Sequence, residues 1–397
     1  MPTAHLPACF VDVHVLQSVP VSTLNRDDLN AVKTVDYGGV RRTRVSSQSW
    51  KRALRTEFQK EIGQFATRTR RVGKAVAEVL ETKHGWDQRE ARQGGAHIVA
   101  ASGIKFGIEG KPDQEDYEAI TNGLVYLSAE SIEELADLAV QHPDKIKKKK
   151  IEKATDKSQL PATGVQEIIR RGNAVIHTFG RMLAEVDDAG VDGAVQVAHA
   201  FTTHRSDVQV DYFTAVDDLT AAWGETGSGH LSEAEFSAGT FYRFATIDVR
   251  ELVANMGKVH TSEIDRDVSE DARRIAGAFL SSFIRSLPQA KKNSTAPHTA
   301  PDLVHISVRS DRPLSFAAAF ETPVRSAQGG GHGAASRDQL VEYAQTATTL
   351  MGTDRILAAH WAGTGREIEG LGTRVDTFDA LVEAGVEAAF APLEGGA

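Results

Sequence analysis

An alternation of apolar and polar residues near the start of the chain predicts a β-strand over residues 10–19. A polar loop over residues 22–36 follows, and residues 40–45, directly after a Gly-Gly pair, predict a short basic strand. A helix is expected from about residue 48 to residue 62, because apolar residues recur there at helical spacing. They are Trp50, Leu54 and Phe58.

The middle of the chain changes to a mainly helical pattern. Residues 63–183 show little strand character, and Ser128 is expected to open a helix with one apolar side. That side carries Ile132, Leu135, Leu138 and Ala139. A basic helix or loop is expected over residues 145–157, and a further helix over residues 192–202.

Strand patterns return after residue 207 and complete an α+β fold, in which a helical insertion interrupts a sheet domain. Two arms of a long hairpin are predicted, with a Gly/Ser-rich tip between them. The arms are residues 208–215 and 240–249, and the tip is residues 224–232. The later expectations are a helix over 264–287, strands over 303–308 and 313–320, and a flexible Gly-rich loop over 328–335.

Size and composition are those of a globular protein that needs no disulfide or metal cross-links to fold. The 397 residues are 41% hydrophobic and 25% charged, which suits two or three domains or one large domain with insertions. Cys9 is the only cysteine, so an internal disulfide is impossible and a cysteine metal site is not expected. The sequence lacks a run of 18 apolar residues and a signal-like start, which predicts a cytoplasmic protein with no membrane contact.

Charge is unevenly distributed along the chain. The whole chain has a net charge of −9, which by itself argues against nucleic-acid binding. Residues 1–60 hold nine Lys/Arg and five Asp/Glu, a net of +4, so the remainder carries −13. Because salt screens charges beyond about 8 Å, this local positive segment decides what a phosphate backbone would meet.

The densest candidate for chemistry is residues 41–55, with six cations and no acid. Gln48, Lys51 and Arg55 share one face of the expected helix, and Ser46 or Ser47 begins it. Hydroxyls, amides and cations are the groups that hold phosphates. On charge alone, the alternative is a solvated basic helix face with an ordinary serine cap.

Several blocks of sequence, in order and spanning residues 10–320, resemble CasC, the guide-RNA (crRNA) binding backbone subunit of type I-E CRISPR Cascade complexes. The first is Leu24-Asn25-Arg26-Asp27-Asp28, and the second runs from Gly38-Gly39 through Ser46-Ser47-Gln48-Ser49 to Lys51-Arg52. The others are Asp211 to Leu219, Glu235 to Arg243, and Arg312-Pro313-Leu314-Ser315. The helical middle and the last 70 residues match weakly, and the role of residues 325–397 stays open.

The resemblance implies an RRM-like (ferredoxin-like) palm with a helical finger insertion and a β-hairpin thumb. The implied boundaries are palm over 1–62, 184–206 and 241–397, finger over 63–183, and thumb over 207–240. It also implies a non-enzymatic subunit without cofactor or metal. Its implied partners are crRNA, target DNA, other Cascade subunits and further copies of itself arranged head-to-tail.

The family's RNA-backbone contacts map onto both the polar loop and the basic segment. Those matched by position are Arg26, Lys33, Ser46, Gln48, Lys51 and Arg55, and the basic block adds Arg41, Arg42, Arg44 and Arg52. A lysine that the family places just after Gly-Gly is Val40 here, so that contact is not expected.

Apolar wedges that unstack RNA bases fall by motif on Met182, Phe213 and Leu231. Without the family, Phe213 would be a cross-strand contact and Met182 a core gap-filler. The resemblance also implies that a run of lysines in the finger guides duplex DNA. The alternative is that these lysines form a basic face that only keeps the protein soluble. The lysines of the run are Lys145, Lys147, Lys148, Lys149, Lys150 and Lys153.

Two other readings stay open. Asp27 and Asp28 could hold Mg²⁺ in a ribonuclease, or could merely stabilise a turn. The second open interpretation is a general RRM-type RNA-binding module outside CRISPR. Histidines do not assemble a site: His199 and His204 lie five residues apart, and His332 lies in Gly-rich sequence.

Overall fold

The computed structural model describes residues 9–112, 114–216, 228–257, 266–326 and 328–394. They form two compact units. The first is drawn from residues 1–58, 195–250 and 259–397, and the second from residues 59–194 and 251–258. The chain passes between them within helices α1 (Ser47–Ile62) and α9 (Val249–Asn255).

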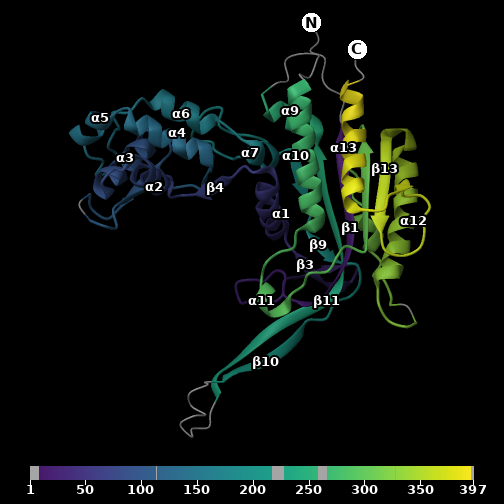
Figure 1. Cartoon of the computed structure of the whole chain (residues 1–397). Helices are drawn as coiled ribbons and strands as arrows, with labels where there is room; N and C mark the ends of the chain where they lie inside the picture. Colours follow the sequence, from purple (N-terminus) through teal and green to yellow (C-terminus); the bar gives the residue numbers. More distant parts are fainter. Residues whose placement is uncertain (1–8, 113, 217–227, 258–265, 327, 395–397) are drawn as a thin grey trace. The chain divides into compact units, whose positions relative to one another are not determined.

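The first unit is built on one large sheet whose strands follow the order β14-β13-β12-β1-β11-β9-β3-β2 (Figure 1). The predicted first strand is confirmed and extends over Phe10–Ser22 (β1), at the centre between β11 and β12, antiparallel to both. The basic strand is also confirmed, as β3. The strands are β2 (Thr34–Tyr37), β3 (Val40–Val45), β8 (Val195–Val197), β9 (Ala200–Thr202), β10 (Gln209–Val216), β11 (Ser228–Asp248), β12 (Leu303–Arg309), β13 (Ile356–Gly363) and β14 (Thr373–Arg374).

One face of the sheet, on which β1 places its valines, is covered by helices. Val13 pairs with Ile306 of β12, and the backbone of α13 (Phe378–Glu394) lies so close that a Cβ on Gly385 would meet Ile306 Cγ2 at 2.9 Å. Arg243, which pairs with Val15, is buried and donates to the Phe283 carbonyl of α10 (Arg266–Arg285). The Arg243 guanidinium also lies 4.0 Å from the Trp50 ring centroid on α1.

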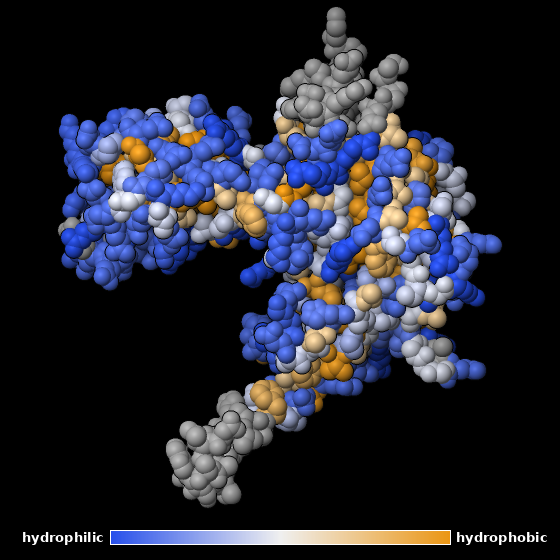
Figure 2. All heavy atoms as spheres, in the orientation of Figure 1, coloured by the Kyte–Doolittle hydropathy of each residue, from blue (hydrophilic) through white to orange (hydrophobic). Residues whose placement is uncertain are grey.

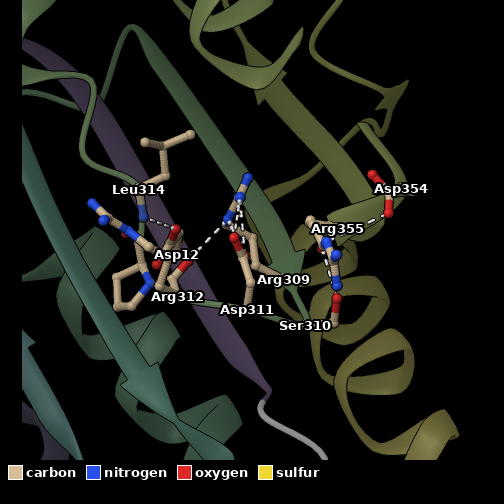
Figure 3. Close-up of polar contacts among 9 residues, drawn as sticks. Asp12, Arg309, Ser310, Asp311, Arg312, Leu314, Asp354 and Arg355 are labelled. Atoms are coloured by element: carbon tan, nitrogen blue, oxygen red, sulfur yellow. Dashed lines mark hydrogen bonds and ion pairs between the residues drawn. The ribbon is translucent and has the colours of Figure 1, made fainter. Parts of the chain in front are cut away.

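The opposite face carries Asp12 and His14 and is covered by the segment after β12. The His14 ring stacks on Phe316 with centroids 4.0 Å apart. Leu314 N donates to Asp12 Oδ2 at 2.8 Å (Figure 3), and burial raises the pKa of Asp12 to about 7. Helix α12 (Gly333–Met351) packs over the same apolar cluster.

The strand predicted over residues 313–320 is wrong. Its backbone N–H groups donate to side chains, Leu314 to Asp12 and Phe316 to the Tyr242 hydroxyl at 2.9 Å, instead of to a neighbouring strand. The segment therefore continues as a 3₁₀ helix, η1 (Ala317–Phe320). The Gly-rich loop is also shorter than predicted, because α12 already begins at Gly333.

The hairpin is made by β10 and only the first part of β11. Gln209 pairs with Phe236 and Thr214 with Leu231, whereas residues from Gly239 to Asp248 pair with β1. The second arm therefore begins earlier than predicted, and the stretch expected as that arm belongs to the sheet. Figure 1 shows the hairpin extending from the sheet, and its tip lies outside the described residues.

Residues 192–202, predicted as a helix, instead contain strands β8 and β9, of which β9 lies between β11 and β3 in the sheet. Val197 pairs with Ala245 of β11, and Ala200 pairs with Val45 of β3. The remaining elements of this unit are α11 (Lys292–Thr295) and η2 (Thr353–Arg355).

The second unit is mainly helical around its own apolar core. The predicted cap is confirmed: Ser128 Oγ accepts from Ser131 N at 3.0 Å and opens α4 (Ala129–Val140). Two short antiparallel pairs, β4 (Ala66–Thr69) with β7 (Val125–Ser128) and β5 (Phe106–Glu109) with β6 (Glu118–Thr121), escape the sequence pattern. The other helices are α2 (Val72–His84), α3 (Gln88–Ala101), α5 (Pro143–Lys148), α6 (Ala162–Arg170) and α7 (Ala174–Phe179).

Candidate nucleic-acid interface

A short chain of hydrogen bonds joins the polar loop before β2 to the start of α1. Asn25 Oδ1 accepts from Ser46 N at 2.9 Å, and the Asn25 carbonyl accepts from Lys33 N at 3.1 Å. The Lys33 carbonyl in turn accepts from Arg44 N at 2.8 Å. Three of the sequence-predicted site residues, Lys33, Arg44 and Ser46, are thereby brought together, and Asn25 is the residue that connects them.

Helix α1 begins as the sequence predicts. Ser46 is buried, and its Oγ accepts from Ser49 N at 3.3 Å as an N-cap. Gln48 and Arg52 are exposed, whereas Lys51 and Arg55 are half-buried. Lys51 Nζ donates to the Val195 carbonyl of β8 at 3.5 Å, which holds this ammonium at the β8–β9 corner.

The Gly-Gly pair makes the turn between β2 and β3. Gly38 and Gly39 have φ of 61° and 75°, the pair of positive values that a tight hairpin turn needs. A Cβ on Gly38 would lie 1.7 Å from the Glu321 carbonyl oxygen, so a side chain is also excluded by space. The turn brings β3 against the segment that follows η1.

Arg42 does not belong to an exposed interface, and this corrects its assignment as an RNA contact. Its guanidinium is fully buried and donates to four backbone carbonyls, of which Glu321 accepts the longest bond, from Nη2 at 3.5 Å. The Nε–H goes to Tyr37 at 3.2 Å, Nη1 to Thr202 at 2.9 Å and Nη2 to Phe320 at 2.9 Å. Its neighbour Arg41 is exposed, and Arg44 is half-buried.

His199, which sequence reasoning sets aside, lies at this corner. Its Nδ1 is 3.0 Å from Arg44 Nη1, and the ring is exposed. Burial, followed by the charges of Arg44 and Lys33, lowers the pKa of His199 from 6.5. Because β3 and β9 are adjacent strands, the contact needs sheet pairing that no local pattern reveals.

The loop that carries Arg26 is a tight turn. Arg26 Nη1 donates to Asn30 Oδ1 at 3.1 Å. Asp27 Oδ1 accepts from Leu29 N and Ala31 N, both at 2.9 Å, which is the turn-stabilising role weighed for it. Asp28 is exposed.

Glu235, at the base of the hairpin, holds the same loop from the other side. Its Oε2 accepts from Val32 N at 2.7 Å, and its carbonyl accepts from Thr23 Oγ1 at 2.5 Å. Loop and hairpin base are therefore one connected structure.

The candidate wedge residues are exposed where the structure describes them. Met182 is 92% exposed in the second unit, which removes the alternative of a core gap-filler. Phe213 is 46% exposed on the hairpin, beside Val210 at 50% and Tyr212 at 69%. Figure 2 shows hydrophobic residues along the described part of the hairpin. The side chain of Leu231 lies outside the described residues.

The lysine run lies on α5 and the loop after it. Ile146 and Ile151 are buried and anchor the segment, and the Lys149 carbonyl accepts from His97 Nε2 at 2.7 Å. Lys147 Nζ pairs with Glu90 at 3.0 Å, and Lys149 Nζ donates to the Lys157 carbonyl at 3.0 Å. The exposed members of the run are Lys145, Lys147, Lys148, Lys150 and Lys153.

The comparison with protein families covers nearly the whole chain. Residues 11–384 match the model of a family described as CT1975-like protein. The chain belongs to the CT1975-like family. No curated protein gives a significant match.

Many chains of solved structures are similar to this one, and two of those structures illustrate the match. One, described as "CRISPR RNA-guided surveillance complex, pre-nicking", has a chain 42% identical, with a TM-score of 0.84, covering 96% of this chain and 100% of that one. A second, described as "CRISPR RNA-guided surveillance complex", has a chain 37% identical, with a TM-score of 0.75 and coverage of 96% and 99%. These matches confirm the resemblance to CasC-type subunits that the motifs indicate. Among the residues that the structure describes, no helix is both long enough and apolar enough to cross a bilayer.

Proposed function

We propose that the chain is the crRNA-binding backbone subunit of a CRISPR surveillance complex of the type I-E Cascade kind, acting in the cytoplasm without catalysing a reaction itself. The observation that carries the proposal is the hydrogen-bonded network through Asn25, which places the Lys33 and Arg44 cations beside the start of α1. Such a corner offers charge and hydroxyls to a phosphate backbone without reading bases.

The palm is proposed to be RRM-like. The strand order β12-β1-β11-β9, with α1 following β1 and α10 following β11, fits a β-α-β-β-α-β arrangement. In that arrangement the second unit is an insertion between α1 and β9, and the hairpin is an insertion between β9 and the sheet portion of β11.

Copies of the subunit are proposed to join head-to-tail along the RNA. The hairpin of each copy would close over RNA held by its neighbour, and Met182, Phe213 and Leu231 would unstack bases at intervals. The high exposure of Met182 and Phe213 supports this role, because a large apolar side chain left in water gains most from a nucleobase contact.

Target DNA is proposed to meet the lysine run of the second unit. Its exposed ammonium groups suit attraction of a duplex by counterion release. Base pairing by the guide would then supply the sequence recognition, as in RNA-guided effectors generally.

Co-purification tests the proposal. Expressed with a CRISPR array and its neighbouring subunits, the chain should retain one RNA species of uniform length. A heterogeneous RNA pool would favour a general RNA-binding module instead. Adding complementary RNA and Mg²⁺ to the complex tests the ribonuclease alternative, since regularly spaced cuts that disappear in Asp28→Ala would overturn the non-enzymatic assignment.

A further inference from the structure

We propose that His199 forms, with Arg44 and Lys33, a phosphate-binding site that takes up a proton when RNA binds. The inference deepens the proposed function, because it assigns a further contact residue and a pH response to the same RNA surface.

The Arg44 contact fixes the state of the imidazole in the free protein. A guanidinium can only donate hydrogen bonds, so His199 Nδ1, 3.0 Å from Arg44 Nη1, must be the acceptor. The ring is therefore neutral there and carries its proton on Nε2. Since His199 is exposed, this N–H can reach a ligand oxygen.

The charges around the ring favour an anion. Those that act on His199 are Arg44, from β3, and Lys33, from the loop before β2, and both are cations. A third cation, Lys51 of α1, also lies near the β8–β9 corner, because its Nζ donates to the Val195 carbonyl at the start of β8. A phosphate between His199 and Arg44 would accept from both, and would replace the Nδ1 acceptor that Arg44 loses when the ring becomes an imidazolium.

Proton uptake sets the direction of the pH effect. A bound phosphate favours the charged imidazole and so raises the pKa of His199 above its lowered value in the free protein. The complex then holds more protons than the free protein, and affinity increases as the pH falls through the window between the two values. Each unit by which RNA raises that pKa gives about a tenfold gain in affinity on crossing the window.

The test is binding of a single-stranded RNA of guide length to the purified chain at pH 8 and pH 6, at constant ionic strength. The wild type should bind more tightly at pH 6, by a factor that approaches about tenfold for a one-unit change only once the pH lies below the free-protein pKa. In His199→Asn the side-chain Oδ1 can still accept from Arg44 but cannot titrate. The gain in affinity between pH 8 and pH 6 should therefore disappear in this variant, whatever its affinity at pH 8.

Two further variants separate the contact of His199 with Arg44 from a general effect of removing an exposed imidazole. His199→Phe should weaken binding at both pH values, because it also releases Arg44. His298→Asn removes another exposed imidazole and should leave the wild-type pH response intact. NMR titration of the His199 ring adds a direct measurement, and RNA or inorganic phosphate should raise its midpoint.

The outcomes also distinguish this inference from the proposed function. A wild-type chain that binds RNA, with a pH response that persists in His199→Asn, would overturn the His199 assignment and leave the RNA-binding role standing. A chain that binds no RNA at either pH would overturn both.

Discussion

At the scale of single residues, Arg41 and Arg42 show why a cation in the sequence does not identify a contact. The two are adjacent in β3, so their side chains point to opposite faces. Arg41 is exposed, whereas Arg42 is buried against the carbonyls of Tyr37, Thr202 and Phe320. Both contribute equally to the positive charge of the segment, but only Arg41 is available to a ligand.

We therefore expect Arg42→Lys to destabilise the fold by about 2 kcal/mol or more, because one ammonium cannot replace the hydrogen bonds of three separate guanidinium nitrogens. Arg41→Ala should change the free energy of unfolding by no more than about 0.5 kcal/mol. Urea unfolding of both variants measures this difference. Normal stability with lost RNA binding in Arg42→Lys would restore Arg42 to the interface.

The candidate site was predictable from the sequence only where its contacts are local. The Ser46 cap and the exposure of Gln48 and Arg52 follow from helical periodicity. The contact of His199 with Arg44 joins residues 155 positions apart, so spacing along the chain carried no signal for it. Asn25 stood inside a recognised motif, but its connecting role depends on a bond to Ser46.

At the scale of elements, the same distinction separates α1 from β8 and β9. The predicted start of α1 differs from the observed one by a single residue, because a cap and a repeating apolar face specify a helix locally. Residues 195–202 are strands because β11 and β3 offer them hydrogen-bonding edges. Their short apolar run fits either element by periodicity alone.

The basic face of α1 should contribute to RNA retention through charge. Lys51→Ala together with Arg55→Ala should weaken binding and reduce the slope of log K against log salt by about 1.4, since each phosphate contact to a single strand contributes about 0.7. Filter binding across a salt series measures the slope. Lys60→Ala, in the last turn of the same helix, is the control and should keep it. An unchanged slope in the double variant would count against this face.

The lysine run on α5 and the loop after it should act on DNA rather than on RNA. Replacing Lys147, Lys148, Lys149 and Lys150 by Ala should reduce target-DNA affinity at least tenfold while RNA retention stays within about twofold. Lys105→Ala with Lys111→Ala, exposed elsewhere in the second unit, controls for lost charge. Mobility shifts with duplex DNA measure the first effect and co-purified RNA the second. Equal loss of both would contradict this division.

At the scale of the whole molecule, the sheet is covered on both faces. An RRM-type sheet stacks bases on the face opposite its helices. Here that face carries His14 and is covered by Phe316 and α12. Residues 325–397, whose role the sequence left open, therefore supply α12 over one face, α13 over the other and two strands at the edge. For the proposed RNA-binding role, the surface that stays uncovered is then the corner where β3, β9 and α1 meet.

Buried and half-buried histidines should make the fold sensitive to acid. Burial is the main cause that lowers the pKa of His177, His204 and His305 to about 4. Their neutral forms support the fold above pH 6.5, and this contribution is lost as the pH falls from 6.5 toward 4. Urea unfolding at several pH values should show declining stability in that window. His305→Phe should reduce the slope by about 1.4 kcal/mol per pH unit, and an unaltered slope would exclude His305 as a contributor.

The carboxylate of Glu235 connects the hairpin to the loop that carries Lys33. It holds Val32 N, and the next residue along the chain is Lys33. A neighbouring subunit that pulls on the hairpin base must therefore move the backbone that carries this lysine. If copies join head-to-tail and hold the guide as proposed, docking of one copy would be coupled to RNA binding, and growth along the RNA would favour contiguous arrays over scattered single subunits.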